Sequence, residues 1–219
     1  MKLYDTVLFD LDGTHTDPAV GIINSVVYAL ERFNIAVDKT SELTKFIGPP
    51  LLESFEKYYG FSESESVKAV EFYREYFREK GIYENIVYNG VVNLLNSLKS
   101  TGRVLIVATS KPEVFAKQIV EHFCLGDFFT FVAGGNLDGT RSKKDEVIDY
   151  ALRSSAIANR SSAIMIGDRK HDIVGAKKVG IDSVGVLYGY GSLNELTDAG
   201  ATYIADSTDE VFRIVCNRI

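Results

Sequence analysis

Five short apolar runs spaced along the chain constrain the fold more than any other feature of the sequence. They are TVLFD (6–10), VLIVATS (104–110), FFTFVAG (128–134), AIMIGD (163–168) and SVGVLY (183–188). Most are continuously apolar and rich in β-branched residues, which is typical of strands buried on both faces of a parallel sheet. Amphipathic stretches with helical periodicity separate the later runs, at roughly 89–100, 112–124, 142–155 and 170–179. This alternation predicts a doubly wound α/β domain with right-handed crossovers.

The interval between the first two runs breaks this rhythm. Residues 11–103 are far more than one crossover needs, and three stretches within them have helical periodicity, at 18–34, 49–59 and 63–80. The Ser/Glu-rich start of the third stretch is typical of an N-terminal helix cap. We therefore expect a helical domain at 16–83, inserted after the first strand of a core domain that comprises 1–15 and 84–219.

Composition excludes several classes of protein. With 219 residues, 46% hydrophobic and 25% charged, the chain is typical of a globular protein with a substantial core. A net charge of −6 without any basic run argues against nucleic acid as a partner. No apolar run approaches the length that spans a membrane, and the first strand begins too close to Met1 for a signal peptide, so we expect a cytoplasmic location. Cys124 and Cys216 are far apart and form no CxxC pattern, which predicts neither a disulfide framework nor a zinc site.

Polar residues follow three of the predicted strands, where each strand ends. They are Asp10 and Asp12 after the first strand, Thr109 and Ser110 at the end of VLIVATS, and Asp168 and Asp172 after AIMIG. The carboxyl ends of parallel strands meet at one edge of a sheet, where open α/β sheets bind their ligands. Asp10, Asp12 and Asp168 would there form an oxygen-rich cluster that suits Mg²⁺. Asp, Gly and Thr are also ordinary turn and helix-cap residues, so the stretch FDLDGTHTDP alone leaves a purely structural interpretation open.

A positive group for such a site is present in RSKKDEVIDYAL. Lys144 lies near the start of the helix that is predicted after the third strand. A lysine at such a position is usually a solvated surface charge. The neighbouring Lys143 would point about 100° away on a helix, so only one of the two can face the sheet edge.

The order of these four features resembles the haloacid dehalogenase superfamily. The features are FDLDGTHTD, IVATS, the second lysine of KKDEVI, and IGDRKHD, and the resemblance covers essentially the whole chain. It is closest to the phosphoglycolate phosphatase-like branch, which includes proteins described as 5′-nucleotidases. The segments that carry this closer match are FIGPPL (46–51), ATSKP (108–112), LDGTRSKKDEVI (137–148) and GDRKHDIVGAKKVGIDSVGVLYGYGS (167–192). The resemblance implies a Rossmann-like core and a helical cap that closes over the site and excludes water.

The resemblance also implies roles for the four aspartates. Asp10 would be the nucleophile that forms an aspartyl-phosphate, and Asp12 would be the general acid and base. Mg²⁺ would be held by Asp10, the Asp12 backbone carbonyl and Asp168. Asp172 would order the water ligands of the ion.

The transferring phosphoryl group would be bound by Thr109, Ser110 and Lys144, together with adjacent backbone N–H groups. Lys144 is preferred over Lys143 because its spacing to the following Val-Ile pair matches the family pattern. The chain would therefore carry, on separate segments, a nucleophile, an acid/base, a metal site and a phosphate-binding cation.

The function implied by the resemblance is Mg²⁺-dependent hydrolysis of a small phosphorylated metabolite, in the manner of phosphoglycolate phosphatase. A 5′-nucleotidase that acts on nucleoside monophosphates and a sugar-phosphate mutase of the same superfamily remain alternatives. A receiver-like phospho-acceptor module is the non-enzyme alternative, but the large insert and the DxD arrangement count against it. No GxSxG, GxxxxGK[ST] or GxGxxG motif occurs, which argues against a nucleophile elbow, a P-loop and a dinucleotide site. The sequence specifies neither the substrate nor the oligomeric state.

His15 departs from the family pattern, in which a leucine follows DxDGT. A buried histidine must find a hydrogen-bond partner or bear a desolvation cost. We expect His15 to be a tolerated core variation that faces away from the acid pair, and the alternative is a proton carrier or a substrate contact.

Overall fold

The computed structural model describes residues 4–216, so the first three and last three residues of the predicted core domain lie outside the described part. A six-stranded parallel sheet has the strand order β5-β4-β1-β6-β7-β8. Its strands are β1 (Thr6–Phe9), β4 (Val104–Pro112), β5 (Phe131–Gly135), β6 (Ala163–Gly167), β7 (Asp182–Val186) and β8 (Tyr203–Ala205). The predicted doubly wound α/β core is confirmed.

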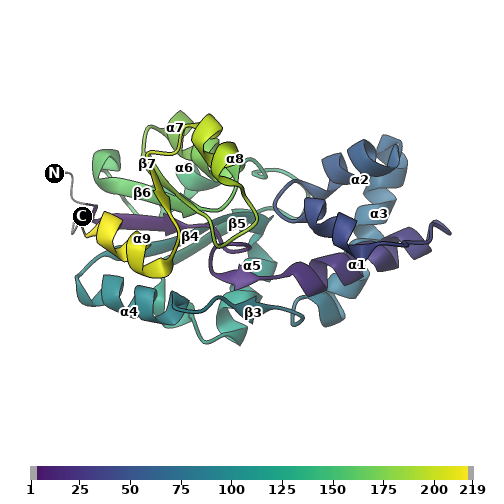
Figure 1. Ribbon diagram of the computed structural model, residues 1–219, viewed down its shortest axis with the longest axis horizontal. Helices are drawn as coiled ribbons and strands as arrows, with labels where there is room; N and C mark the ends of the chain where they lie inside the picture. Colours follow the sequence, from purple (N-terminus) through teal and green to yellow (C-terminus); the bar gives the residue numbers. More distant parts are fainter. Residues whose placement is uncertain (1–3, 217–219) are drawn as a thin grey trace. The chain divides into compact units, whose positions relative to one another are not determined.

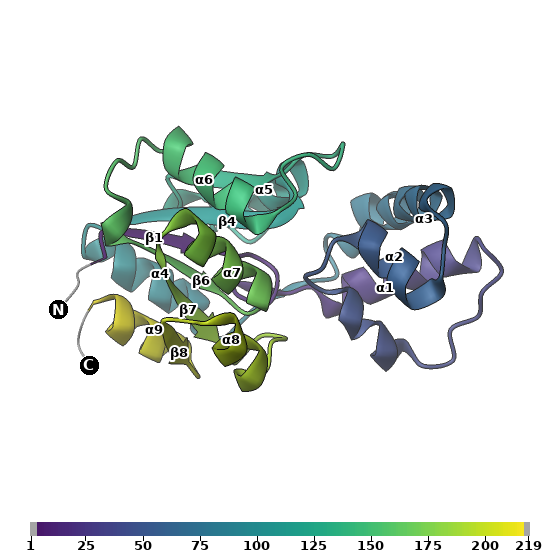
Figure 2. The same cartoon turned by 90° about the horizontal axis from the view of Figure 1, so that it is seen from above.

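Helices cover both faces of this sheet (Figures 1 and 2). One face carries α6 (Lys144–Ser154), α7 (Lys170–Val179) and α8 (Leu193–Ala199), and the other carries α4 (Val91–Ser100), α5 (Glu113–His122) and α9 (Thr208–Val215). The chain turns to the second direction along the sheet after β5, because β6 pairs with β1 on the side opposite β4. In a doubly wound sheet this reversal places a crevice at the carboxyl ends of the central strands.

Strand β1 lies at the centre of the core unit and is fully buried. Its Phe9 is in register with Val107 of β4 and with Ile166 of β6. One side of the sheet packs against α6 and α7 through fully buried side chains, among them Leu8, Ile106, Met165, Val147, Ile148 and Ala151. Burial of such side chains contributes roughly 1.5–3 kcal/mol each and fixes where the three central strands end.

The chain divides into two compact units. One comprises Met1–Thr16 and Val87–Ile219, and the other comprises Asp17–Ile86. The second unit contains α1 (Ala19–Glu31), a 3₁₀ segment (Thr40–Phe46), α2 (Leu51–Tyr59), α3 (Glu63–Tyr76) and a π-helical turn (Phe77–Gly81). The predicted limits of the inserted domain, 16–83, fall close to this division. At the division, the short strands β2 (Thr16–Asp17) and β3 (Ile86–Val87) pair with each other.

Helix α3 begins as its sequence predicts. Ser62 is the N-cap, and its Oγ accepts a hydrogen bond from the Glu65 N–H. The Glu65 carboxylate in turn accepts a hydrogen bond from the Ser62 N–H, at 2.8 Å. Such a reciprocal capping box satisfies two of the N–H groups that a helix start leaves unpaired.

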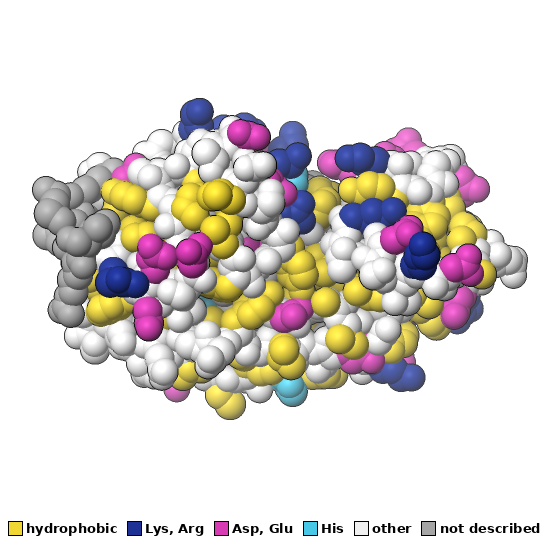
Figure 3. Space-filling view, in the orientation of Figure 1, with side chains coloured by type: hydrophobic (Ala, Val, Ile, Leu, Met, Phe, Trp, Pro, Cys, Tyr) yellow, Lys and Arg dark blue, Asp and Glu magenta, His cyan; other side chains and the backbone are white. Residues whose placement is uncertain are grey.

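The face of the molecule in Figure 3 carries charges of both signs. On the face shown in Figure 3, Lys and Arg side chains are interspersed with Asp and Glu side chains. Within residues 4–216, no helix is both long enough and apolar enough to cross a membrane. Cys124 and Cys216 are free thiols.

Candidate active site

The carboxyl ends of three adjacent strands bring the predicted site residues together. Asp10 directly follows β1, and its N–H donates to the Ile166 carbonyl of β6 at 2.9 Å. Asp168 directly follows β6, and Thr109 lies within β4 on the other side of β1. The parallel register therefore places residues more than a hundred positions apart in sequence at one edge of the sheet.

Three carboxylates form a buried acidic cluster at this edge. Asp10, Asp168 and Asp172 each contribute one oxygen atom, and these atoms all lie within 4.8 Å of one another. Asp168 and Asp172 are fully buried, and Asp10 is 8% exposed. Burial raises the pKa of Asp168, and the nearby carboxylates of Asp172 and Asp10 raise it further. A cluster of this kind requires positive charge to remain ionised.

Lys144 supplies positive charge inside the cluster. Its Nζ lies 2.9 Å from Asp10 Oδ1 and 2.8 Å from Asp172 Oδ1, and it donates to the Ala108 carbonyl at 3.3 Å. Burial by itself lowers the pKa of the Lys144 ammonium, but the two carboxylates raise it above its ordinary value. Lys144 is the first residue of α6 and is 6% exposed, whereas Lys143 is exposed. Of the two candidate lysines, the structure places Lys144 at the sheet edge.

Asp12 lies beside the cluster with a different partner. Its Oδ2 is 2.6 Å from the Nζ of Lys111, and its buried Oδ1 has no hydrogen-bond partner among the described residues. Burial raises the pKa of the Asp12 carboxyl, and the Lys111 ammonium opposes this rise. A raised pKa suits a carboxyl group that must donate a proton near neutral pH.

The two predicted phosphate-binding hydroxyl residues differ in environment. Thr109 is 2% exposed, and its Oγ1 accepts a hydrogen bond from the Lys111 N–H at 3.3 Å. Ser110 is partly exposed, and its hydroxyl makes no hydrogen bond within the described residues. Thr109 is therefore fixed by the turn that also carries Lys111, whereas the Ser110 hydroxyl is not fixed.

Glycines allow these charged side chains to approach the backbone closely. A Cβ added to Gly13, whose φ is +81°, would lie 2.2 Å from Asp168 Oδ2. A Cβ at Gly167 would lie 2.2 Å from the Asp172 Cγ, and one at Gly175 would lie 2.9 Å from the Lys144 Cβ. Since real Cβ atoms essentially never come closer than 3.0 Å, a side chain at any of these positions would displace a member of the cluster.

His15 lies behind the nucleophile candidate. It is 1% exposed, and its Nδ1 is 2.8 Å from the Asp10 carbonyl oxygen. Its ring packs against Phe9 and Phe129, with centroid distances of 4.7 and 5.3 Å. Burial lowers the pKa of the imidazole to about 4, so the ring is neutral at pH 7 and its Nδ1–H donates to the carbonyl. The partner that a buried histidine requires is thus the backbone of Asp10.

Residues 7–186 match the family described as haloacid dehalogenase-like hydrolase. The chain belongs to this family. The match contains every predicted site residue, from Asp10 to Asp172.

Relatives and solved structures of similar sequence indicate the enzyme class within this family. A protein named 5′-nucleotidase from Pseudomonas aeruginosa is 48% identical over 204 residues, which cover 93% of this chain and 92% of that protein. A phosphoglycolate phosphatase from Colwellia psychrerythraea is 27% identical and covered to 97%. The crystal structure of a predicted phosphatase from Clostridium acetobutylicum is 51% identical, with a TM-score of 0.95 over 99% of this chain and 100% of that one. The chain is a phosphatase of the haloacid dehalogenase-like family.

One relative bears the name of a different reaction. Tyrosine-protein kinase PtkA from Mycobacterium tuberculosis is 36% identical over 208 residues, which cover 94% of this chain and 70% of that protein. The haloacid dehalogenase-like scaffold is thus present in proteins with different names, and function has to be argued from the site.

The residues of this haloacid dehalogenase-like site fit a small divalent cation. All of the candidate ligand atoms are oxygens, which Mg²⁺ prefers. The buried Oδ1 of Asp168, a member of the cluster, has no hydrogen-bond partner within the described chain, so it is an acceptor with no protein donor. A cation there would offset the mutual repulsion of the carboxylates. Both oxygens of Asp172 are already engaged, by Lys144 and by the Arg169 N–H at 3.1 Å, which suits a supporting position.

Sequence reasoning gave no role to two contacts of this site. Lys111 was part of the ATSKP segment, but nothing in that segment predicts its ion pair with Asp12. The Tyr190 N–H donates to Asp168 Oδ2 at 2.8 Å, although nothing in the sequence assigned the GYGS segment a role of its own. The only indication in the sequence was that Lys111 and Tyr190 both lie in segments that carry the resemblance to the phosphatase family.

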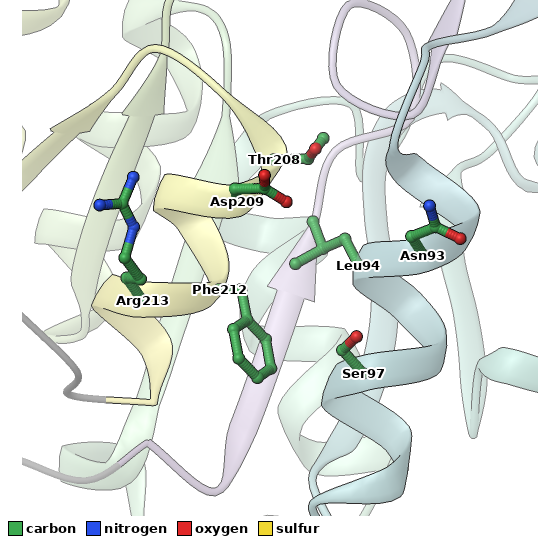
Figure 4. Close-up of a pocket in the computed structure, with 7 residues that line it drawn as sticks. All are labelled: Asn93, Leu94, Ser97, Thr208, Asp209, Phe212 and Arg213. Carbon is green, nitrogen blue, oxygen red and sulfur yellow. The ribbon is translucent and has the colours of Figure 1, made fainter.

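A hollow in the core unit is separate from the acidic cluster. It lies between α4 and α9, has a volume of about 360 Å³, and is lined by Asn93, Leu94, Ser97, Thr208, Asp209, Phe212 and Arg213 (Figure 4). None of the predicted site residues lines it. The chemistry of the strand ends, and not this groove, therefore identifies the active site.

Proposed function

We propose that this chain is a Mg²⁺-dependent phosphatase that hydrolyses a small phosphate monoester through an aspartyl-phosphate at Asp10. The observation that carries the proposal is the buried Lys144 ammonium, which lies within 3 Å of both Asp10 and Asp172. A structural role alone would not require a lysine paired with two carboxylates of a three-carboxylate buried cluster, since burying charge is costly. Binding an anionic phosphoryl group is a physical reason to retain such a cluster.

The reaction then proceeds in two steps. A carboxylate oxygen of Asp10 attacks phosphorus, the bond to the ester oxygen breaks, and the leaving alkoxide takes a proton from the Asp12 carboxyl. In the second step, the Asp12 carboxylate takes a proton from a water molecule that attacks the aspartyl-phosphate. Inorganic phosphate leaves, and both carboxyl groups return to their initial protonation states. The raised pKa of Asp12 supports its role as the acid of the first step.

The phosphoryl oxygens would be held by Lys144, Thr109, Ser110 and nearby backbone N–H groups. Their charge is spread over the oxygens in the transition state, so fixed donors supply most of the stabilisation. Mg²⁺ would be held by Asp10, the Asp12 carbonyl and Asp168, with Asp172 in support, and it would neutralise negative charge on the phosphoryl group. The helical unit, Asp17–Ile86, would act as a cap that excludes water during the reaction.

Two substrate classes are supported unequally. The relative named 5′-nucleotidase is 48% identical, whereas the relative named phosphoglycolate phosphatase is 27% identical. We therefore rank nucleoside 5′-monophosphates ahead of phosphoglycolate, which the sequence resemblance alone had favoured. The sugar-phosphate mutase and the receiver-like module remain as outcomes of the test.

The test is a phosphate-release screen with the full chain and Mg²⁺. Nucleoside 5′-monophosphates, phosphoglycolate and sugar phosphates would be compared at equal concentration, with a chelator as control. We expect many turnovers on at least one ester and their loss with the chelator. A single stoichiometric phosphorylation without turnover would indicate a receiver-like module. A rearranged sugar phosphate with little free phosphate would indicate a mutase.

A further inference from the structure

The loop that follows β7 lies directly over Asp168. Residues 189–191, Gly-Tyr-Gly, belong to this loop, and the Tyr190 N–H donates to Asp168 Oδ2 at 2.8 Å. Tyr190 is 22 positions from Asp168 in sequence, so the contact depends on the tertiary fold. Within residues 4–216, this is the hydrogen bond that the Asp168 carboxylate accepts.

The two glycines are required by space and not by backbone conformation. Neither Gly189 nor Gly191 is among the residues with positive φ. A Cβ on Gly189 would lie 2.3 Å from the Gly13 carbonyl oxygen and 2.4 Å from the Asp168 Cβ. A Cβ on Gly191 would lie 1.9 Å from the Asp168 carbonyl oxygen. Any side chain at either position would push the loop away from Asp168.

Because of this contact, the two oxygens of Asp168 have different environments. Oδ2 receives the Tyr190 N–H, while the buried Oδ1 has no hydrogen-bond partner in the described part of the chain. In Asp172, by comparison, Oδ1 lies 2.8 Å from Lys144 Nζ and Oδ2 receives a backbone N–H. The buried Asp172 Oδ1 also has no hydrogen-bond partner in the described chain, but it lies in the ion pair with Lys144, so Asp168 Oδ1 is the oxygen with neither a donor nor a cation beside it.

We propose that residues 189–191 are a positioning element for the metal site, in which the Tyr190 N–H orients Asp168 and the two glycines allow that approach. The element rests on the proposed Mg²⁺ site. Mg²⁺ demands near-ideal octahedral geometry, so a ligand whose rotation is fixed from behind binds it better than one that rotates freely. The donor to Asp168 is the backbone N–H of Tyr190.

The first experiment measures Mg²⁺ binding directly, by calorimetry on the full chain without substrate. Gly189→Ala and Gly191→Ala should each weaken Mg²⁺ binding by about tenfold or more, as expected when an outer partner of a metal ligand is removed. Gly126→Ala is the matched control, because an added Cβ there meets nothing within 4 Å. Gly126→Ala should bind Mg²⁺ as the parent does. If it weakens Mg²⁺ binding as much as Gly189→Ala and Gly191→Ala do, the positioning role proposed for residues 189–191 is wrong.

A double-mutant cycle separates positioning from general loosening of the loop. If Gly189 acts through Asp168, then Gly189→Ala should cause little further loss of Mg²⁺ affinity in an Asp168→Asn background. An equal loss in both backgrounds would overturn the proposal. Circular dichroism and melting temperature confirm that each variant is folded.

A variant that adds no atoms covers the case in which the alanine variants do not fold. Replacing Tyr190 by its α-hydroxy acid changes one amide into an ester and so removes the N–H donor, while it also makes the Gly189 carbonyl a weaker acceptor. We expect the folded ester variant to bind Mg²⁺ about tenfold more weakly. Unchanged affinity would overturn the positioning role while leaving the proposed phosphatase reaction intact, and a parent protein that binds no Mg²⁺ would overturn both.

Discussion

The two units of this molecule differ in whether they bury charged side chains. In the core unit, Asp10, Lys144, Asp168 and Asp172 are buried together at the ends of the central strands. In the helical unit, Asp17–Ile86, the buried polar residues are three serines, at positions 25, 54 and 66.

Several cations of the helical unit instead lie over aromatic rings. Lys45 Nζ is 4.5 Å from the Tyr58 ring centroid, and the Arg32 guanidinium is 4.8 Å from that of Tyr28. Such contacts leave the charge in water and are worth about 0.5–1 kcal/mol. The difference teaches that the core unit buries charged groups at a cost in stability, whereas the helical unit buries only uncharged polar groups.

The strongest test of this comparison removes the nucleophile. Asp10→Asn should lower turnover by at least about a thousandfold, because the amide cannot form an acyl-phosphate. The side chain is nearly isosteric, so we expect the fold to be retained, as circular dichroism would show. Steady-state phosphate release provides the measurement. Activity within tenfold of the parent would remove Asp10 from its assigned role.

The second test compares two adjacent lysines in the core unit. Lys144→Ala should lower kcat by roughly 100- to 1,000-fold, the range for loss of one fixed donor to a developing charge. It also leaves Asp10 and Asp172 without their buried counter-charge, so melting temperature should fall. Lys143→Ala is the matched control, because Lys143 is exposed. Equal effects of the two substitutions would show that the buried cluster does not bind phosphate.

The third test concerns Lys111, which the sequence alone did not assign. Lys111→Met removes the ammonium 2.6 Å from Asp12 and should lower kcat roughly ten- to a hundredfold with little change in KM, since the acid loses its fixed position. Lys111→Arg should restore part of the loss. Lys117→Met, at an exposed position on α5, serves as control. A pure KM effect would indicate that Lys111 binds substrate.

The fourth test moves to the helical unit. Arg74 on α3 is half-buried, and burial together with the nearby Arg78 lowers the pKa of its guanidinium. No ion pair of Arg74 is present within residues 4–216, and we predict that its guanidinium binds a substrate anion. Arg74→Ala should raise KM for the preferred substrate by about tenfold and leave p-nitrophenyl phosphate turnover unchanged. The exposed Lys68→Ala is the control, and equal loss on both esters would argue against a specificity role.

The smallest effect on rate is expected for His15→Leu. Turnover should stay within several-fold, because the imidazole contacts a backbone carbonyl and not a reacting atom. Stability should change by roughly 1–3 kcal/mol, since the buried Nε2 lacks a partner in the described chain.

The pH dependence of this effect has a definite sign. The folded-state pKa of His15 is about 4, below the ordinary value of 6.5, so folding disfavours protonation. The parent therefore loses stability as pH falls from about 6.5 toward 4, and the leucine variant does not. Melting temperature against pH checks this, and parallel curves would contradict the assignment of a buried neutral imidazole.

Much of the fold followed from local patterns. The five apolar runs became β1, β4, β5, β6 and β7 to within a few residues, because continuous apolarity is required of strands covered on both faces. Among the elements that were not predicted are β8, α8 and α9, all of which are short. β8 has only three residues, too few for any periodicity to appear.

The candidate site divides in the same way. The sequence by itself determined the identities and order of the aspartates, and the fact that they follow strands, because side-chain chemistry and strand patterns are local properties. The family spacing also selected Lys144 over Lys143. The tertiary structure alone decided which groups meet: Lys111 with Asp12, His15 with the Asp10 carbonyl, and the Tyr190 N–H with Asp168. Every residue except proline carries a backbone N–H, so residue type does not predict which N–H will orient a metal ligand.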